Sequence, residues 1–297
     1  MNVLVTGAAG FIGSHIVDLA VEKGHKVYGI DSLITGKIEN VNPKCEFIRD
    51  DIREFDYETL GKLDGIFHTA ALARIQPSFL NPVRYESTNV IGTLLLIEYA
   101  MKSDSKIIFS SSSSVYGVQG KLSSPMDESY PLNPSSPYAV QKLTCERYLE
   151  LFRKFGNLRY MALRYFNVYG PRQIKDGDYA AVVGIFLGKN RDDKPFPIYG
   201  DGSQRRDFTF VKDVALANLL ALESNIDSGI YNIGSGANHS VLDIANFINY
   251  TNPIEYLPKR NGEAAETLAD YRRAFTDFGW QPQTKINEWL KSEVSKG

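Results

Sequence analysis

The chain has 297 residues, 43% of them hydrophobic and 23% charged, with a formal net charge of −2. That length suits one large domain or two smaller ones with a substantial core. The balanced charge argues against a nucleic-acid-binding domain, which is usually basic. No apolar run approaches the roughly 20 residues that span a membrane. The two cysteines, Cys45 and Cys145, lack metal-ligand spacing, so we expect free thiols, no metal site and a cytoplasmic protein.

Short runs rich in β-branched residues alternate with helical patterns over the first 170 residues. In chain order, the patterns predict a strand over 2–7, a helix over 13–24, strands over 25–31, 45–52 and 64–70, a helix over 81–102, a strand over 106–112, a helix over 136–156 and a sixth strand from 158. Strands that alternate with helices predict an α/β fold. We expect a Rossmann-like, doubly wound parallel sheet with helices on both faces.

The composition changes after Gly170, where glycine, proline and charged residues become frequent. This change predicts a domain boundary near residue 170. The second part is smaller and mixed in character, with helices predicted over 211–224 and 240–250.

The segment GAAGFIG, Gly7 to Gly13 with Gly10 between them, lies between the first strand and the first helix. Residues without side chains let the backbone approach a pyrophosphate, and the helix start offers free N–H groups. Asp31 ends the second strand, where a carboxylate binds the adenosine ribose. No arginine follows immediately, which favours NAD, although the nearby Lys37 leaves NADP open. Asp51 and Ile52 lie at the end of the third predicted strand and are expected to flank the adenine.

Tyr138 and Lys142 are four residues apart on a predicted helix and therefore share a face. This helix follows the fifth strand at the carboxyl edge of the sheet, where such folds bind ligands. A nearby ammonium and an oxidised nicotinamide would both favour the Tyr138 phenolate, so Tyr138 is a candidate base. The serine run 110–114 ends the fifth strand, and one hydroxyl there can bind the same substrate oxygen. The residues alone do not indicate which serine.

Taken together, the segments TGAAGFIGSH, FHTAA, SSSSSVYG, SPYAVQK, LRYFNVYGPR and YGDGSQRRDF resemble the extended short-chain dehydrogenase/reductase family. They are most similar to its nucleotide-sugar 4-epimerases of the UDP-glucose/UDP-galactose type, over essentially the whole chain. The resemblance implies that Ser112, four residues before Tyr116, acts beside Tyr138 and Lys142. It also implies a homodimer, in which the two long helices pair across the interface.

The resemblance implies further contacts in two groups. Those to NAD are Phe11, Ile12, Asp31, Asp51, Ile52, Ala70, Ala71 and Asn89, with Lys142 on the nicotinamide ribose. Those to the UDP-sugar are Asn167, Ile198, Tyr199, Arg206, Arg260 and Glu263. Arginines suit a diphosphate because they donate charge-assisted, often bidentate hydrogen bonds. Thr267 matches the family position that limits the C2 substituent of the sugar, and its small side chain predicts room for an N-acetyl group.

We therefore expect residues 1–170 to form the NAD-binding domain, with a later segment near 205–235 returning to it. Residues 171–297 are expected to bind the nucleotide sugar. The implied reaction is a 4-epimerisation: Tyr138 takes the 4-hydroxyl proton, hydride passes from C4 to NAD, and the 4-keto sugar turns over before hydride returns to its other face.

The motifs leave four other functions to compare with epimerisation. In 4,6-dehydratases and decarboxylases of this family an acidic pair stands where this chain has Ser113 and Ser114, which argues against both activities. A 4-reductase, which would release oxidised cofactor and more often use NADPH, stays open. A non-catalytic NAD-binding module is a more distant alternative, because such a protein would have lost Tyr138 or Lys142.

Overall fold

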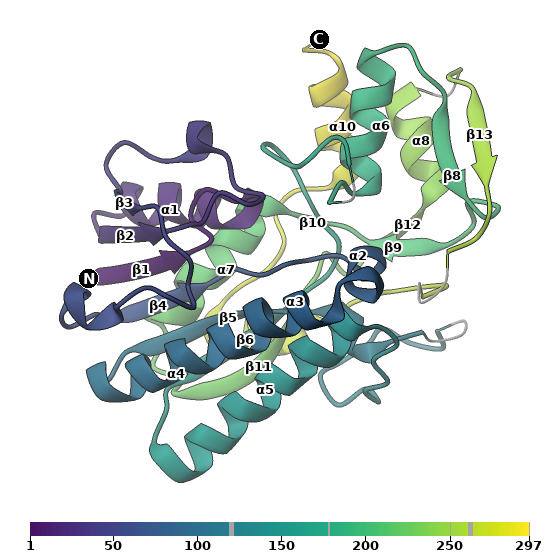
Figure 1. The fold of residues 1–297 in the computed structure, drawn as a ribbon. Coiled ribbons are helices and arrows are strands. Elements are labelled where there is room, and N and C mark those ends of the chain that lie inside the picture. Colours follow the sequence, from purple (N-terminus) through teal and green to yellow (C-terminus); the bar gives the residue numbers. More distant parts are fainter. Residues whose placement is uncertain (119–121, 178, 250, 261–263, 297) are drawn as a thin grey trace.

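The computed structural model describes residues 1–118, 122–177, 179–249, 251–260 and 264–296. These residues form a central seven-stranded parallel sheet (Figure 1). In spatial order its strands are β11 (Ser228–Ile233), β6 (Tyr160–Tyr165), β5 (Lys106–Ser112), β4 (Gly65–His68), β1 (Asn2–Thr6), β2 (Lys26–Ile30) and β3 (Glu46–Ile48). The strand order reverses between β1 and β4, and ligands of open α/β sheets bind at such a point. The predicted α/β, doubly wound fold is confirmed.

Helices cover both faces of the sheet, because successive side chains of each strand point to opposite sides. Val3 and Val5 pack with α1 (Phe11–Glu22) and α7 (Val211–Glu223). Leu4 packs on the other face with α4 (Gly92–Ser103) and α5 (Pro137–Gly156). Burial on both faces explains why the strands read as continuous apolar runs.

Two predicted elements differ in detail. The third strand ends at Ile48 rather than residue 52, because the carboxylate of Asp51 accepts a hydrogen bond from the backbone N–H of Arg53 and turns the chain. The single helix predicted over 81–102 is instead α3 (Pro82–Glu86), a π-helical turn over Ser87–Ile91, and α4. Such turns are frequent at functional sites.

The later part of the chain is mixed, as expected. Parallel pairs are formed by β8 (Phe196–Tyr199) with β13 (Ile254–Leu257) and by β7 (Val168–Tyr169) with β10 (Thr209–Phe210). The pair of β9 (Arg205–Asp207) and β12 (Asn238–Ser240) is antiparallel. A separate apolar core joins β7, β8, β10 and β13 to three helices, α6 (Val182–Arg191), α8 (Val241–Asn249) and α10 (Ile286–Val294).

The chain returns to the first sheet twice. The first return consists of α7 and β11, both of which lie within the segment expected to come back near 205–235. The second return, which the sequence did not indicate, brings α9 (Arg272–Phe278) against β11 and buries Trp280 in the core below α7. The division into domains at residue 170 stays a prediction.

The remaining elements are short. They are α2 (Ile75–Leu80) and 3₁₀ turns over Ile38–Asn40, Tyr57–Leu60 and Ser113–Tyr116. Within the described ranges, no helix combines the length and apolar character needed to cross a membrane. The described residues also contain no cluster of three His, Cys, Asp or Glu side chains suited to a metal ion.

Candidate active site

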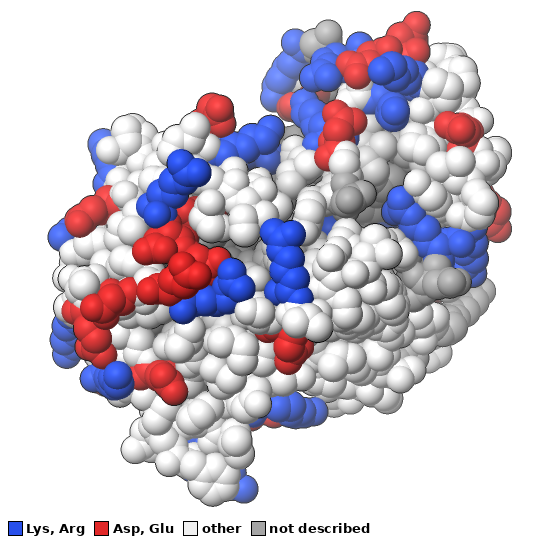
Figure 2. All heavy atoms as spheres, in the orientation of Figure 1, with Lys and Arg blue, Asp and Glu red and all other residues white. Residues whose placement is uncertain are grey.

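A cavity of about 820 Å³ lies at the carboxyl edge of the sheet, between the sheet and the later part of the chain. Figure 2 shows a hollow between these two parts, with Lys and Arg side chains near it. The predicted site residues that line the cavity are Gly7, Gly10, Phe11, Ile12, Gly13, Asp31, Asp51, Ile52, Ala70, Ala71, Ser112, Tyr138, Asn167, Tyr199, Arg206, Arg260 and Thr267. The side chains of Asn89, Lys142 and Ile198 lie behind this wall. Glu263 lies outside the described residues.

The glycine segment between β1 and α1 forms a closely packed cradle. A side chain at Gly13 would place its Cβ 2.1 Å from the carbonyl oxygen of Gly7, and Gly7 itself has a φ of +71°. Only glycine fits such positions. The cradle opens onto the start of α1, whose free N–H groups suit a pyrophosphate. These residues therefore fit a dinucleotide.

Asp31 lies at the end of β2, beside this cradle. Its carboxylate accepts hydrogen bonds from the backbone N–H groups of Ala9 (3.0 Å) and Leu33 (2.7 Å). Burial raises the pKa of Asp31, and these backbone hydrogen bonds oppose the rise. The carboxylate is thus held in place at the cavity wall, as a ribose-binding group needs to be.

Asp51 and Asn89, which were predicted to contact the cofactor, bind other residues of the chain near the cavity. The Asp51 carboxylate is bound by the Arg53 guanidinium, with Nη2–Oδ2 at 2.6 Å, which lowers its pKa. The buried Asn89 amide, from the π-helical turn, accepts from the N–H of Leu72 (2.8 Å) and donates to its carbonyl (3.0 Å). Asn89 therefore fixes the loop after β4, which carries Ala70 and Ala71 along the cavity.

Tyr138 begins α5, one residue after Pro137, and its side chain reaches the cavity. Ser112, at the end of β5, lies beside its hydroxyl. Burial raises the pKa of Tyr138, while the Ser112 hydrogen bond and the charge of Arg74 lower it. The arrangement pairs a phenol with a hydroxyl at one point of the cavity wall, where both can bind one substrate oxygen.

Lys142 lies one turn further along α5 and is buried. Its Nζ donates to the carbonyl oxygen of Ser110 (2.7 Å) and lies 5.9 Å from the centre of the Tyr138 ring. Burial lowers the pKa of Lys142 to about 8. In this structure the cation that lowers the pKa of Tyr138 is Arg74, which the sequence reasoning missed.

The serines of the run 110–114 have different partners. The hydroxyl of Ser110 pairs with that of Tyr165 (3.1 Å), and Ser111 donates to Glu146. Ser112 contacts Tyr138 and accepts from the backbone N–H of Ser114 (3.1 Å). The Ser114 hydroxyl is buried beside the cavity and has no hydrogen-bond partner among the described residues. A run that resembles a linker is therefore a rigid strand end.

The opposite end of the cavity is basic and aromatic. The Arg260 guanidinium lies over the Tyr199 ring, 3.5 Å from its centre, and Arg206 lines the wall nearby. Thr267 is almost completely buried, and its hydroxyl accepts a hydrogen bond from the backbone N–H of Asp207 (3.2 Å). This end offers cations for a diphosphate and a flat surface for a base.

Comparison with known proteins agrees with this geometry. The profile of the NAD dependent epimerase/dehydratase family matches residues 3–234. The chain belongs to this family. A putative UDP-glucose 4-epimerase of Methanocaldococcus jannaschii is 40% identical, over 99% of this chain and 97% of its own.

Two solved structures of family members are similar along their whole length. One is the UDP-N-acetylglucosamine 4-epimerase of Methanobrevibacter ruminantium in complex with UDP-N-acetylmuramic acid, with a TM-score of 0.93, 39% identity and coverage of 99% and 97%. The other is the UDP-glucose 4-epimerase of Thermotoga maritima with UDP-glucose, with a TM-score of 0.92, 39% identity and coverage of 99% and 98%.

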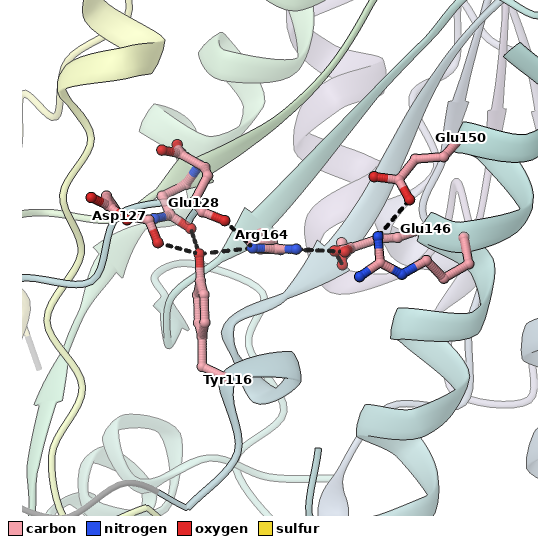
Figure 3. A network of polar contacts seen from close by, with 9 residues as sticks. Tyr116, Asp127, Glu128, Glu146, Glu150 and Arg164 are labelled. Atoms are coloured by element: carbon pink, nitrogen blue, oxygen red, sulfur yellow. Dashed lines mark hydrogen bonds and ion pairs between the residues drawn. The ribbon is translucent and has the colours of Figure 1, made fainter. Parts of the chain in front are cut away.

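Behind the serines of this epimerase-family chain lies a buried polar network (Figure 3). The Arg164 guanidinium binds the Glu146 carboxylate through two hydrogen bonds of 2.9 and 2.7 Å, and both side chains are inaccessible to solvent. Arg164 also donates to the hydroxyl of Tyr116 (3.0 Å). Because Glu146 accepts from Ser111, the network joins α5, β6 and the serine turn, and it fixes the position of Ser112.

Other residues that line the cavity carried no sequence signal. They include Arg74, Tyr179 and Lys189. Each lies in a loop or at a helix end. Each reaches the cavity because distant parts of the chain pack together, and neither sequence periodicity nor a motif predicts such contacts.

Proposed function

We propose that this epimerase-family chain catalyses the NAD-dependent 4-epimerisation of a UDP-hexose through a transient 4-keto sugar. The observation that carries the proposal is that Tyr138 and Ser112 lie side by side at the wall of a cavity that also contains the glycine cradle. The substrates named for its relatives are UDP-glucose and UDP-N-acetylglucosamine, which supports a UDP-sugar here.

In this proposal, different residues of the chain transfer the proton, stabilise the oxygen at C4 and bind the diphosphate. Tyr138 accepts the proton of the 4-hydroxyl, and Ser112 donates a hydrogen bond to the same oxygen as it becomes a carbonyl. Arg206 and Arg260 hold the diphosphate while the sugar turns over, and Tyr138 then returns the proton. NAD, when bound, would supply a reversible acceptor for the hydride that leaves C4 of the sugar. Gly7, Gly10, Gly13 and Asp31 hold this cofactor.

The test of the proposal needs no added cofactor. Purified protein is incubated with UDP-galactose and, separately, with UDP-N-acetylgalactosamine, and the products are separated by chromatography. Formation of the 4-epimer is expected, because no net redox change occurs and NAD is recycled in place. A product that forms only with stoichiometric NADPH would instead support the 4-reductase. Absence of any product after NAD is added would exclude epimerisation of these sugars.

A second prediction concerns the space beside Thr267 for the C2 substituent of the sugar. Thr267→Tyr adds a large side chain to the cavity wall and should lower kcat/KM for the N-acetylated pair by at least 10-fold relative to the plain pair, because bulk excludes the C2 substituent. Thr267→Val is the matched control, since it also removes the hydroxyl that binds the N–H of Asp207 but adds no volume. An equal loss for both sugar pairs in Thr267→Tyr would show that this position does not limit the C2 substituent.

We also propose a homodimer and a cytoplasmic location. Apolar side chains are exposed along α3 and α5, with Val83 81% and Phe155 74% accessible and Val140 and Leu151 beside them. A shallow apolar groove, separate from the active-site cavity, runs along α5 between Val140 and Lys154. A second copy of the chain would cover this face, and Cys45 and Cys145 are both free thiols, as expected in a reducing compartment. Light scattering would measure the molecular mass.

A further inference from the structure

Arg74 occupies a strained position at the cavity wall. It lies in the loop between β4 and α2, and its φ is +104°, a conformation that side-chain-bearing residues rarely adopt. Strain of this kind persists where the surroundings enforce it, and it is concentrated at functional sites. Here the guanidinium is anchored by one hydrogen bond, from its Nε to the carbonyl oxygen of Tyr179 (2.8 Å).

The charge of Arg74 has no acidic counterpart within the described ranges. The groups that interact with it electrostatically are the phenols of Tyr138 and Tyr85, and burial lowers its pKa. A desolvated cation is costly unless an anion meets it. By contrast, Arg53 and Arg164 are each bound to a carboxylate, at 2.6 and 2.7 Å. Because no described carboxylate meets this cation and Arg74 lines the cavity, a ligand bound there can supply the matching anion.

The position of Arg74 limits which anionic group of a ligand can pair with it. The phosphates of the cofactor are assigned to the glycine cradle, and those of UDP to Arg206 and Arg260. Arg74 is instead near Tyr138, whose pKa its charge lowers. Helix α2, which begins directly after Arg74, packs on the start of α5. There the Ser78 hydroxyl of α2 accepts a hydrogen bond from the backbone N–H of Tyr138. Tyr138 acts at the C4 hydroxyl, so the neighbouring ligand groups are the substituents on C3 and C5.

We propose that Arg74 binds a carboxylate carried next to C4 of the sugar, so that this enzyme acts on acidic UDP-sugars and prefers them to their neutral counterparts. The inference rests on the proposed 4-epimerisation and adds the substrate class. The carboxylate can belong to C6, as in a UDP-hexuronic acid, or to an ether on O3, as in UDP-N-acetylmuramic acid. Both present one carboxylate to one guanidinium, which can bind it through two hydrogen bonds.

The experiment compares kcat/KM within matched substrate pairs, UDP-glucuronic acid against UDP-glucose and UDP-N-acetylmuramic acid against UDP-N-acetylglucosamine. The wild-type enzyme should favour the acidic member of one pair, which identifies the carbon that carries the carboxylate. Arg74→Gln should lower that acid-to-neutral ratio by about 10- to 100-fold, the usual range for losing a hydrogen bond to a charged group. Glutamine keeps a side chain of similar length on the same backbone, and Arg74→Lys should restore part of the ratio.

Arg172→Gln is the matched control. Arg172 also has a positive φ, +64°, but it pairs with Asp18 and does not line the cavity, so the ratio should stay at the wild-type value. Turnover of neutral sugars with no turnover of either acid would overturn the inference and leave the proposed function intact. An equal loss on both members of a pair in Arg74→Gln would also overturn it, since Arg74 would then act on Tyr138. If no sugar is epimerised, the proposed function itself fails.

Discussion

Replacing Tyr138 by phenylalanine should lower kcat for 4-epimerisation by about 10²- to 10⁴-fold, the usual contribution of a positioned acid–base group. The ring would keep its packing at the start of α5, while the one group that can take the 4-hydroxyl proton would be gone. The Ser112 hydroxyl would stay in place, because it also accepts a hydrogen bond from the backbone N–H of Ser114. Stopped assays with product separation would measure kcat, and the NAD released on denaturation would show that cofactor binding persists.

Tyr256→Phe is the control for this prediction. Tyr256 is exposed on β13 and lies outside the cavity, so loss of its hydroxyl should leave kcat unchanged. If Tyr138→Phe retained more than a tenth of the wild-type kcat, another group would have to be the base.

The second large effect concerns stability. Arg164→Met should lower the free energy of unfolding by about 3–5 kcal/mol, because it leaves the Glu146 carboxylate buried without its counter-charge. Urea denaturation followed by circular dichroism would measure the change. The activity of the folded variant should also fall, since Ser111 and the turn that carries Ser112 depend on the same carboxylate.

A surface pair on the same helix provides the comparison. Arg147 and Glu150 are joined at 2.6 Å but are 59% and 37% exposed, so Arg147→Gln should cost no more than about 1 kcal/mol. The double variant Arg164→Met/Glu146→Leu should recover much of the lost stability, because no unpaired charge remains. Equal costs for Arg164→Met and Arg147→Gln would show that the buried pair is not the source of the effect.

The sequence predicted those parts of the site that depend on local geometry. The glycine cradle follows from a strand–turn–helix pattern, and Tyr138 and Lys142 share a helix face because they are four residues apart. The serine run could not be interpreted from the residues alone, since the partners of its hydroxyls come from α5 and β6. Arg74 could not be predicted either, because its position depends on a positive φ and on Tyr179, 105 residues later in the chain.

The second return of the chain has a consequence for cooperativity. Trp280 is fully buried below α7 and donates a hydrogen bond to the carbonyl oxygen of Asp213 (2.8 Å), on a face of the sheet built mainly from the first 170 residues. A fragment that ended at residue 170 would expose that face to water, because α7, β11 and Trp280 would be missing. The nucleotide-binding sheet therefore completes its core only after nearly the entire chain has been synthesised, and the early and late segments should melt in one transition.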